Sequence, residues 1–130
     1  MYEKITKNVS VRVKPSYLEE QSSPEDNHFV WAYHVRIENQ GDETLTLHSR
    51  YWKIMDDRGS TQIVEGDGVV GEQPILNPGD VFEYTSGTPL TTASGIMVGS
   101  YFMKSVDGTD LQVEIPAFSL DSPYQIAVIH

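Results

Sequence analysis

Six residues in the middle of the chain match the glycine spacing of a phosphate-binding loop. They run Gly66-Asp67-Gly68-Val69-Val70-Gly71, the G-x-G-x-x-G pattern, directly after a predicted strand at 62–65. In dinucleotide-binding proteins this loop opens a helix whose N-terminus meets the pyrophosphate. Here Pro74 and Pro78 follow and would break such a helix, and Asp67 places a negative charge where phosphate would bind. The context therefore argues against a dinucleotide site.

Two other interpretations of the same segment remain open. It is either a tight loop that presents a partner-binding surface, or a nest of backbone amides that holds a small anion or a nucleotide phosphate. Outward N–H groups near 68–71 would favour the anion, and internally bonded ones would favour a protein partner. We expect residues 66–80 to be ordered, because two apolar pairs, 69–70 and 75–76, can anchor them. The candidate binding residues are Gly66, Gly68, Val69, Val70, Gly71 and Glu72.

Histidine and aspartate side chains are the candidate metal ligands of this sequence. The four histidines, at 28, 34, 48 and 130, show no close ligand spacing. His34 and His48 would meet only if their two strands formed a hairpin, and a solvated polar face explains them better. The acidic pairs at 56–57 and 107/110 flank turn glycines, where aspartate bonds the local backbone. We therefore predict no metal site, although direct divalent-metal binding stays open as an alternative.

No set of residues forms a convincing catalytic group. The pairs Ser86-Gly87 and Ser94-Gly95 lack the strand–turn–helix context of a nucleophile elbow. Cysteine is absent, which excludes a thiol nucleophile, a thiolate zinc site and a disulfide framework. The expectation is a protein that is not an enzyme, with no catalytic residue and no cofactor.

Composition narrows the class of partner and the cellular compartment. The chain has 130 residues and a net charge of −10, which fits one domain, 1–130, and disfavours direct contact with nucleic acid. No apolar run is long enough to span a bilayer, and the N-terminus lacks the apolar core of a signal peptide. We therefore expect a cytoplasmic protein that contacts no membrane.

Alternation of apolar and polar residues dominates the chain. The clearest example is 29–37, where Phe29, Trp31, Tyr33, Val35 and Ile37 alternate with more polar neighbours. After 45 and 47 the apolar positions change parity to 52 and 54, which predicts a bulge near 49–51. Short strands separated by Gly, Pro, Asn and Asp turns predict an all-β chain: one antiparallel β-sandwich of fibronectin type III or immunoglobulin type, with about seven or eight strands. The expected core comprises Trp31, Tyr33, Val35, Ile37, Trp52, Ile54, Tyr101 and Ile115.

Long strings in the second half of the chain resemble the ApaG family. They are 51–56 (YWKIMD), 64–74 (VEGDGVVGEQP), 76–79 (LNPG), 82–90 (FEYTSGTPL), 95–101 (GIMVGSY) and 115–120 (IPAFSL). The resemblance implies a fibronectin type III-like sandwich and a genetic link to cobalt resistance and magnesium efflux. It also implies a protein-interaction module, since the same domain occurs in eukaryotic proteins that associate with DNA polymerase and in F-box proteins. The expected function is non-enzymatic binding of a protein partner, and a homodimer stays open.

Overall fold

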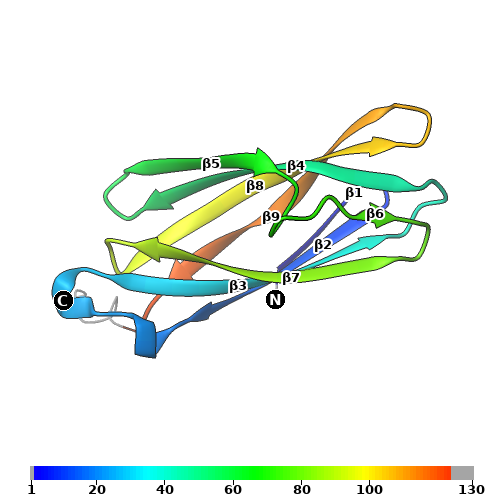
Figure 1. Cartoon of the computed structure of the whole chain (residues 1–130). Helices are drawn as coiled ribbons and strands as arrows, with labels where there is room; N and C mark the ends of the chain where they lie inside the picture. The colour runs from blue at the N-terminus through cyan, green and yellow to red at the C-terminus, as the bar shows by residue number, and fades with distance from the viewer. Residues whose placement is uncertain (1, 124–130) are drawn as a thin grey trace.

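The structure is a computed structural model that describes residues 2–123, and it consists of two antiparallel β-sheets packed face to face (Figure 1). The strands are β1 (Tyr2–Thr6), β2 (Val9–Tyr17), β3 (Phe29–Asn39), β4 (Leu45–Asp56), β5 (Thr61–Asp67), β6 (Ile75–Leu76), β7 (Val81–Leu90), β8 (Ser94–Ser105) and β9 (Asp110–Asp121). One sheet has the order β1-β2-β3-β7. The other has the order β5-β4-β8-β9, with β6 paired to the opposite end of β4 from β5.

The predicted all-β sandwich is confirmed, with nine strands in place of seven or eight. The additional strands are β1, which has only two half-buried residues in five, and the two-residue β6. Neither is long enough or regular enough to give an alternation signal. The polar segment between β2 and β3 forms two single 3-10 turns at Glu19–Gln21 and Pro24–Asp26. No helix in residues 2–123 has the length and apolar character needed to cross a membrane.

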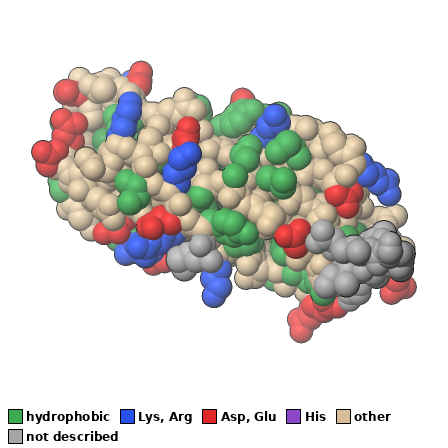
Figure 2. Space-filling view, turned by 180° about the vertical axis from the view of Figure 1, so that it is seen from behind, with side chains coloured by type: hydrophobic (Ala, Val, Ile, Leu, Met, Phe, Trp, Pro, Cys, Tyr) green, Lys and Arg blue, Asp and Glu red, His purple; other side chains and the backbone are tan. Residues whose placement is uncertain are grey.

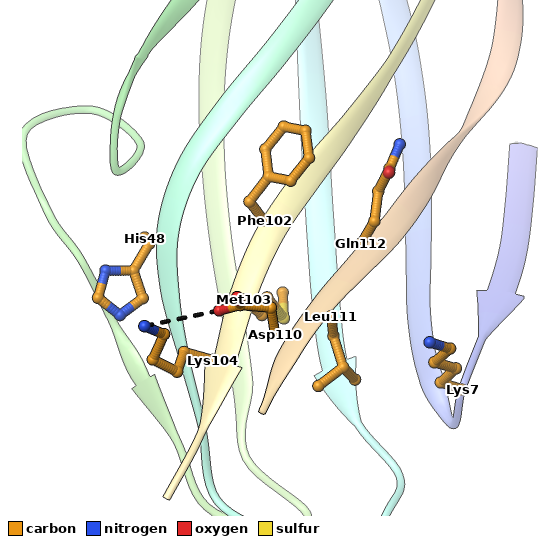
Figure 3. A pocket seen from close by; sticks show the side chains of 8 residues that line it. All are labelled: Lys7, His48, Phe102, Met103, Lys104, Asp110, Leu111 and Gln112. Carbon is orange, nitrogen blue, oxygen red and sulfur yellow. Dashed lines mark ion pairs between the residues drawn. The ribbon is translucent and has the colours of Figure 1, made fainter. Parts of the chain in front are cut away.

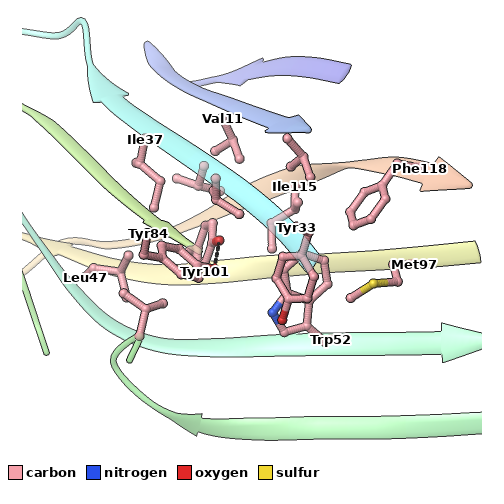
Figure 4. Close-up of a cluster of buried hydrophobic side chains, with 14 of the residues drawn as sticks. Val11, Tyr33, Ile37, Leu47, Trp52, Tyr84, Met97, Tyr101, Ile115 and Phe118 are labelled. Carbon is pink, nitrogen blue, oxygen red and sulfur yellow. Dashed lines mark hydrogen bonds between the residues drawn. The ribbon is translucent and has the colours of Figure 1, made fainter. Parts of the chain in front are cut away.

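One hydrophobic core lies between the two sheets, and Figure 4 shows part of it. All eight residues predicted for this core are buried, with exposed fractions of 6% or less. Trp52 packs edge-on against Tyr33, at 5.2 Å between ring centroids, and against Phe118, at 6.0 Å. Such aromatic pairs add stability beyond the area that they bury. The two sheets are therefore joined by rings from β3, β4 and β9.

The predicted change of parity is present in β4. Its pairing with β8 shifts between Leu47 and Ser49, so that one extra residue, His48, lies outside the regular register. Because of this bulge, Leu47 and Trp52 both point into the core although they are five residues apart. The bulge begins slightly before the predicted position at 49–51. It places the carbonyl of His48 next to the segment that follows β5.

Candidate partner-binding site

The glycine-rich segment folds into a second, very short hairpin after β5. The N–H of Val69 donates to the carbonyl of Glu72 at 2.8 Å, and the N–H of Glu72 donates back to the carbonyl of Val69 at 2.9 Å. The two central residues, Val70 and Gly71, have φ angles of +43° and +81°. A two-residue turn with positive φ at both positions is of type I′, the turn that matches the twist of paired strands. No helix follows the segment, in agreement with the argument against a dinucleotide site.

The short hairpin is fixed to the bulged part of β4. The carbonyl of His48 accepts hydrogen bonds from the N–H of Gly68 at 2.7 Å and from Nε2 of Gln73 at 2.9 Å. The N–H of Leu47 donates to the carbonyl of Pro74 at 3.0 Å. In addition, Nη1 of Arg50 donates to the carbonyl of Gly68 at 2.9 Å. These bonds hold the segment against the sheet, as expected for an ordered loop.

Only one side chain of each expected apolar pair, 69–70 and 75–76, is buried and can anchor the segment. Val69 is completely buried and Leu76 is 2% exposed, whereas Val70 is 54% exposed and Ile75 is 64% exposed. All four are expected anchors, but consecutive side chains of the turn and of β6 point in opposite directions, so that only one of each pair is buried. Two apolar side chains therefore remain on the surface of this segment. Val70 stands at the tip of the short hairpin.

The backbone amides of this segment divide between the two arrangements set out above. The N–H groups of Gly68, Val69 and Glu72 are used in internal hydrogen bonds, whereas those of Val70 and Gly71, at the tip of the turn, are not among the internally bonded groups. The carboxyl groups of Asp67 and Glu72 flank the turn, where they would repel an anion. The argument against an anion at this turn is therefore the charge of these carboxylates.

His34 and His48 are both exposed, as the favoured interpretation of a solvated polar face expects, and the alternative in which they meet across a hairpin is wrong. The segment between them leads from β3 in one sheet to β4 in the other, so the two strands do not form a hairpin. His34 bonds to Oγ1 of Thr85 at 2.9 Å and to Oε1 of Glu83 at 3.0 Å, both on the neighbouring strand β7. His130 lies outside the described residues. Among residues 2–123, no group of three His, Asp or Glu side chains is placed to hold a metal ion.

Asp56 and Asp107, which lie beside turn glycines, accept hydrogen bonds from backbone N–H groups of their own turns. Oδ1 of Asp56 accepts hydrogen bonds from the N–H groups of Arg58 and Ser60, both at 2.9 Å. Oδ1 of Asp107 accepts from the N–H of Thr109 at 3.0 Å and also bonds to the Ser105 hydroxyl. Hydrogen bonds from the Ser105 hydroxyl, and from the side chain and N–H of Thr109, hold the pKa of Asp107 down, at about 2. The turn interpretation is therefore confirmed for Asp56 and Asp107.

A shallow hollow on the sheet β5-β4-β8-β9, shown in Figure 3, was not predicted from the sequence. It has a volume of about 620 Å³ and contains the ion pair between Lys104 and Asp110, at 3.6 Å. Its lining residues come from β4, β8, β9 and the β1–β2 turn: Lys7, His48, Phe102, Met103, Lys104, Asp110, Leu111 and Gln112. A signal was available, because 95–104 carries apolar residues at both parities. A strand with that pattern has apolar side chains on both faces.

Exposed apolar side chains are distributed over the surface. On the face seen in Figure 2, hydrophobic side chains form several small groups between acidic and basic ones. The most exposed ones include Val106 in the β8–β9 turn, at 81%, and others, such as Ile63 in β5, are about half exposed, at 49%. Scattered apolar residues of this kind are ordinary. Val70 differs from them because its backbone is held in an unfavourable conformation.

Comparisons with known proteins agree with this architecture. The family model described as the ApaG domain matches residues 19–105. The protein named ApaG from Rhodospirillum centenum is 59% identical over 95% of each chain, and that from Parvibaculum lavamentivorans is 55% identical over the whole of both. A crystal structure from Bordetella pertussis, of a protein named ApaA, is 45% identical with a TM-score of 0.86 and covers 88% of this chain and 94% of its own. The chain belongs to the ApaG family.

Proposed function

We propose that this protein is a non-enzymatic module that binds another protein through the short hairpin at 68–72. The observation that carries the proposal is the exposure and backbone conformation of Val70, whose side chain is 54% exposed and whose φ is +43°. A β-branched residue in this region is a genuine outlier and costs about 1–3 kcal/mol. Asparagine or glycine would occupy the same turn position without that cost.

The chemistry around Val70 indicates the kind of partner. The turn carries Glu72, and Asp67 precedes it, so carboxylates flank the apolar tip. A complementary surface would offer an apolar recess bordered by Lys or Arg side chains. Because the hairpin is already held by hydrogen bonds to β4, its binding would cost little conformational entropy. The expected partner is therefore a protein with a basic, apolar-floored recess.

The proposal includes the link to cobalt resistance and magnesium efflux that the family resemblance implies. A protein that regulates a transport component by binding to it would produce that link without holding either metal. The partner would then be a component of metal-ion transport or of its control. Growth in cobalt, with the chromosomal gene deleted and variants supplied in its place, tests this part.

The experiment uses Val70→Asn with Val106→Asn as the matched control. Both remove an exposed apolar side chain from a turn, but only the first lies in the short hairpin. Affinity capture from a native extract should retain one stoichiometric protein with the wild type and with Val106→Asn, and lose it with Val70→Asn. The cobalt tolerance of the deletion strain should follow the same pattern. Equal retention by all three baits, or no retained protein, would overturn the proposal.

A further inference from the structure

Strand β5 ends its sheet with an unpaired edge. Within residues 2–123 it pairs only with β4, from Met55 opposite Thr61 to Ser49 opposite Asp67. Figure 1 shows β5 at the border of its layer. An unpaired edge exposes a row of backbone N–H and C=O groups that can pair with another strand.

The hydrogen bonds at both ends of β5 identify the residues whose backbone groups are free. The N–H of Asp56 donates to the carbonyl of Ser60, and the N–H of Gly68 donates to the carbonyl of His48. Bonded pairs alternate along an antiparallel ladder, so 62, 64 and 66 bond to β4. The N–H and C=O groups of Thr61, Ile63 and Glu65 therefore point away from the sheet, whereas the carbonyl of Asp67 already accepts a hydrogen bond from Nη1 of Arg50 at 3.2 Å.

Two of the other border strands contain proline, whereas β5 contains none. Strand β7 contains Pro89, which cannot donate to a ladder, and β9 contains Pro116. Strand β9 is also covered by β1, where Oγ1 of Thr6 accepts a hydrogen bond from the N–H of Glu114 at 3.3 Å. Strand β5 has the sequence TQIVEGD, without Pro or Lys, and its outward Ile63 is 49% exposed.

We propose that this protein forms a symmetric dimer in which β5 pairs antiparallel with β5 of a second copy. The sequence of the strand is self-complementary when the two-fold axis passes through Ile63. Ile63 then lies opposite Ile63 of the second copy, and Thr61 lies opposite Glu65. A register centred on Glu65 would instead oppose two carboxylates, which destabilises a strand pair.

The chosen register also brings opposite charges together. It places the β4–β5 turn, which carries Arg58, beside the end of β5 in the second copy, which carries Asp67. In a chain with a net charge of −10, this arrangement brings a cation to an acidic strand end without opposing two carboxylates. The result is one continuous sheet through both copies, with the same surface used on each side, as a two-fold interface requires. This proposal is independent of the partner-binding hairpin at 68–72.

The test compares Ile63→Lys with Ile96→Lys by sedimentation and light scattering over a wide range of protein concentration. Ile96 lies on the same outer face, 46% exposed, but in the interior strand β8. The wild type and Ile96→Lys should approach twice 14.6 kDa as concentration rises. Ile63→Lys should weaken the dimer by about tenfold or more, because it opposes two ammonium groups across the axis. A wild type that stays monomeric throughout, or an Ile63→Lys variant that dimerises equally well, would overturn the proposal.

A cross-link gives a second measurement that does not depend on a destabilising change. The chain has no cysteine, so a single introduced thiol can bond only to its copy. Directly opposed, bonded residues lie about 5.5 Å apart between Cα atoms, which is within disulfide range. Ile63→Cys should form a covalent dimer under mild oxidation, and Ile96→Cys should not. Equal cross-linking of the two variants would show that the contact is non-specific and would refute the β5 pairing.

Discussion

The hydroxyl groups of Tyr84 and Tyr101 hydrogen-bond to each other inside the sandwich, although β7 and β8 belong to different sheets (Figure 4). Tyr101 is completely buried and Tyr84 is 8% exposed. Burial raises the pKa of both phenols. Tyr84 raises the pKa of Tyr101 further, whereas the hydrogen bond with Tyr101 lowers that of Tyr84, and the charge of Arg50 lowers both. The pair thus joins the two layers by a polar contact between two phenols that burial keeps neutral.

This pair predicts a loss of stability at alkaline pH. A phenol whose folded pKa lies above the value of about 10 in the unfolded chain contributes stability fully below that pH and loses it as the pH rises further. The free energy of unfolding should therefore fall above pH ~10. Replacing both residues by phenylalanine should flatten this dependence, which urea melts at a series of pH values will show. Equal slopes for the wild type and the double variant would contradict the prediction.

Truncation of one member of the pair has a separate consequence. Tyr101→Phe leaves the buried Tyr84 hydroxyl without its partner, which should cost about 1–3 kcal/mol at neutral pH. The double Phe variant removes both polar groups and should cost less than the sum of the two single variants. A double-mutant cycle measured by urea melts checks this. Additive costs would mean that the hydroxyls do not stabilise each other.

Trp52 should be the most costly single truncation in the core. It is 2% exposed and packs edge-on against Tyr33 and Phe118 from the other strands of the core. Trp52→Ala should reduce the free energy of unfolding by about 3–5 kcal/mol, from lost burial and the cavity that remains. Phe102→Ala, an aromatic truncation on the outer face of the same sheet at 39% exposure, is the control and should cost clearly less. Similar losses for the two would contradict the assigned core.

The alternation of side chains predicted the fold class and the core because it determines which face a residue occupies. Trp31, Tyr33, Val35 and Ile37 share one parity of β3, and that parity faces the core. The parity change in β4 was readable for the same reason, since a one-residue bulge reverses every later side chain. Local patterns of this kind require no knowledge of the neighbouring strands.

Alternation does not say which strands are neighbours. His34 and His48 lie on strands joined by a short connection, so a hairpin between them stayed open until the structure showed that the connection crosses between the sheets. The positive φ of Val70 was also unreadable, because turn preferences favour Asn or Gly at that position and valine goes against them. The candidate residues at 66–72 were found from glycine spacing, but the conformation of Val70 required the structure.

The lowered pKa of Asp107 predicts that the protein loses stability at acid pH. Its pKa of about 2 lies below the value of about 3.9 expected in the unfolded chain. A carboxylate with a lowered folded pKa contributes stability above pH ~4 and loses it as the pH falls toward 2. Asp107→Asn should therefore reduce the dependence of the melting temperature on pH between these values. Asp42→Asn, another exposed carboxylate in a turn, should leave that dependence closer to the wild type.

The two glycines of the short hairpin should respond differently to alanine. Both have positive φ, +63° for Gly68 and +81° for Gly71. A Cβ at Gly68 would lie 2.1 Å from the carbonyl oxygen of Glu72, whereas a Cβ at Gly71 would meet nothing within 4 Å. Gly71→Ala should thus cost only the backbone strain, about 1–2 kcal/mol. Gly68→Ala must also open the hairpin, since the carbonyl it meets belongs to the bond that closes the turn.

We therefore expect Gly68→Ala to lose more stability than Gly71→Ala and to expose residues 66–80 to protease under native conditions. Urea melts and limited proteolysis of the two variants and the wild type measure both effects. Val70→Asn should move in the other direction, resisting protease at least as well as the wild type, because it relieves the strain of the turn. If Gly68→Ala and Gly71→Ala behaved alike in both measurements, the bond between Val69 and Glu72 would not be what holds the hairpin closed.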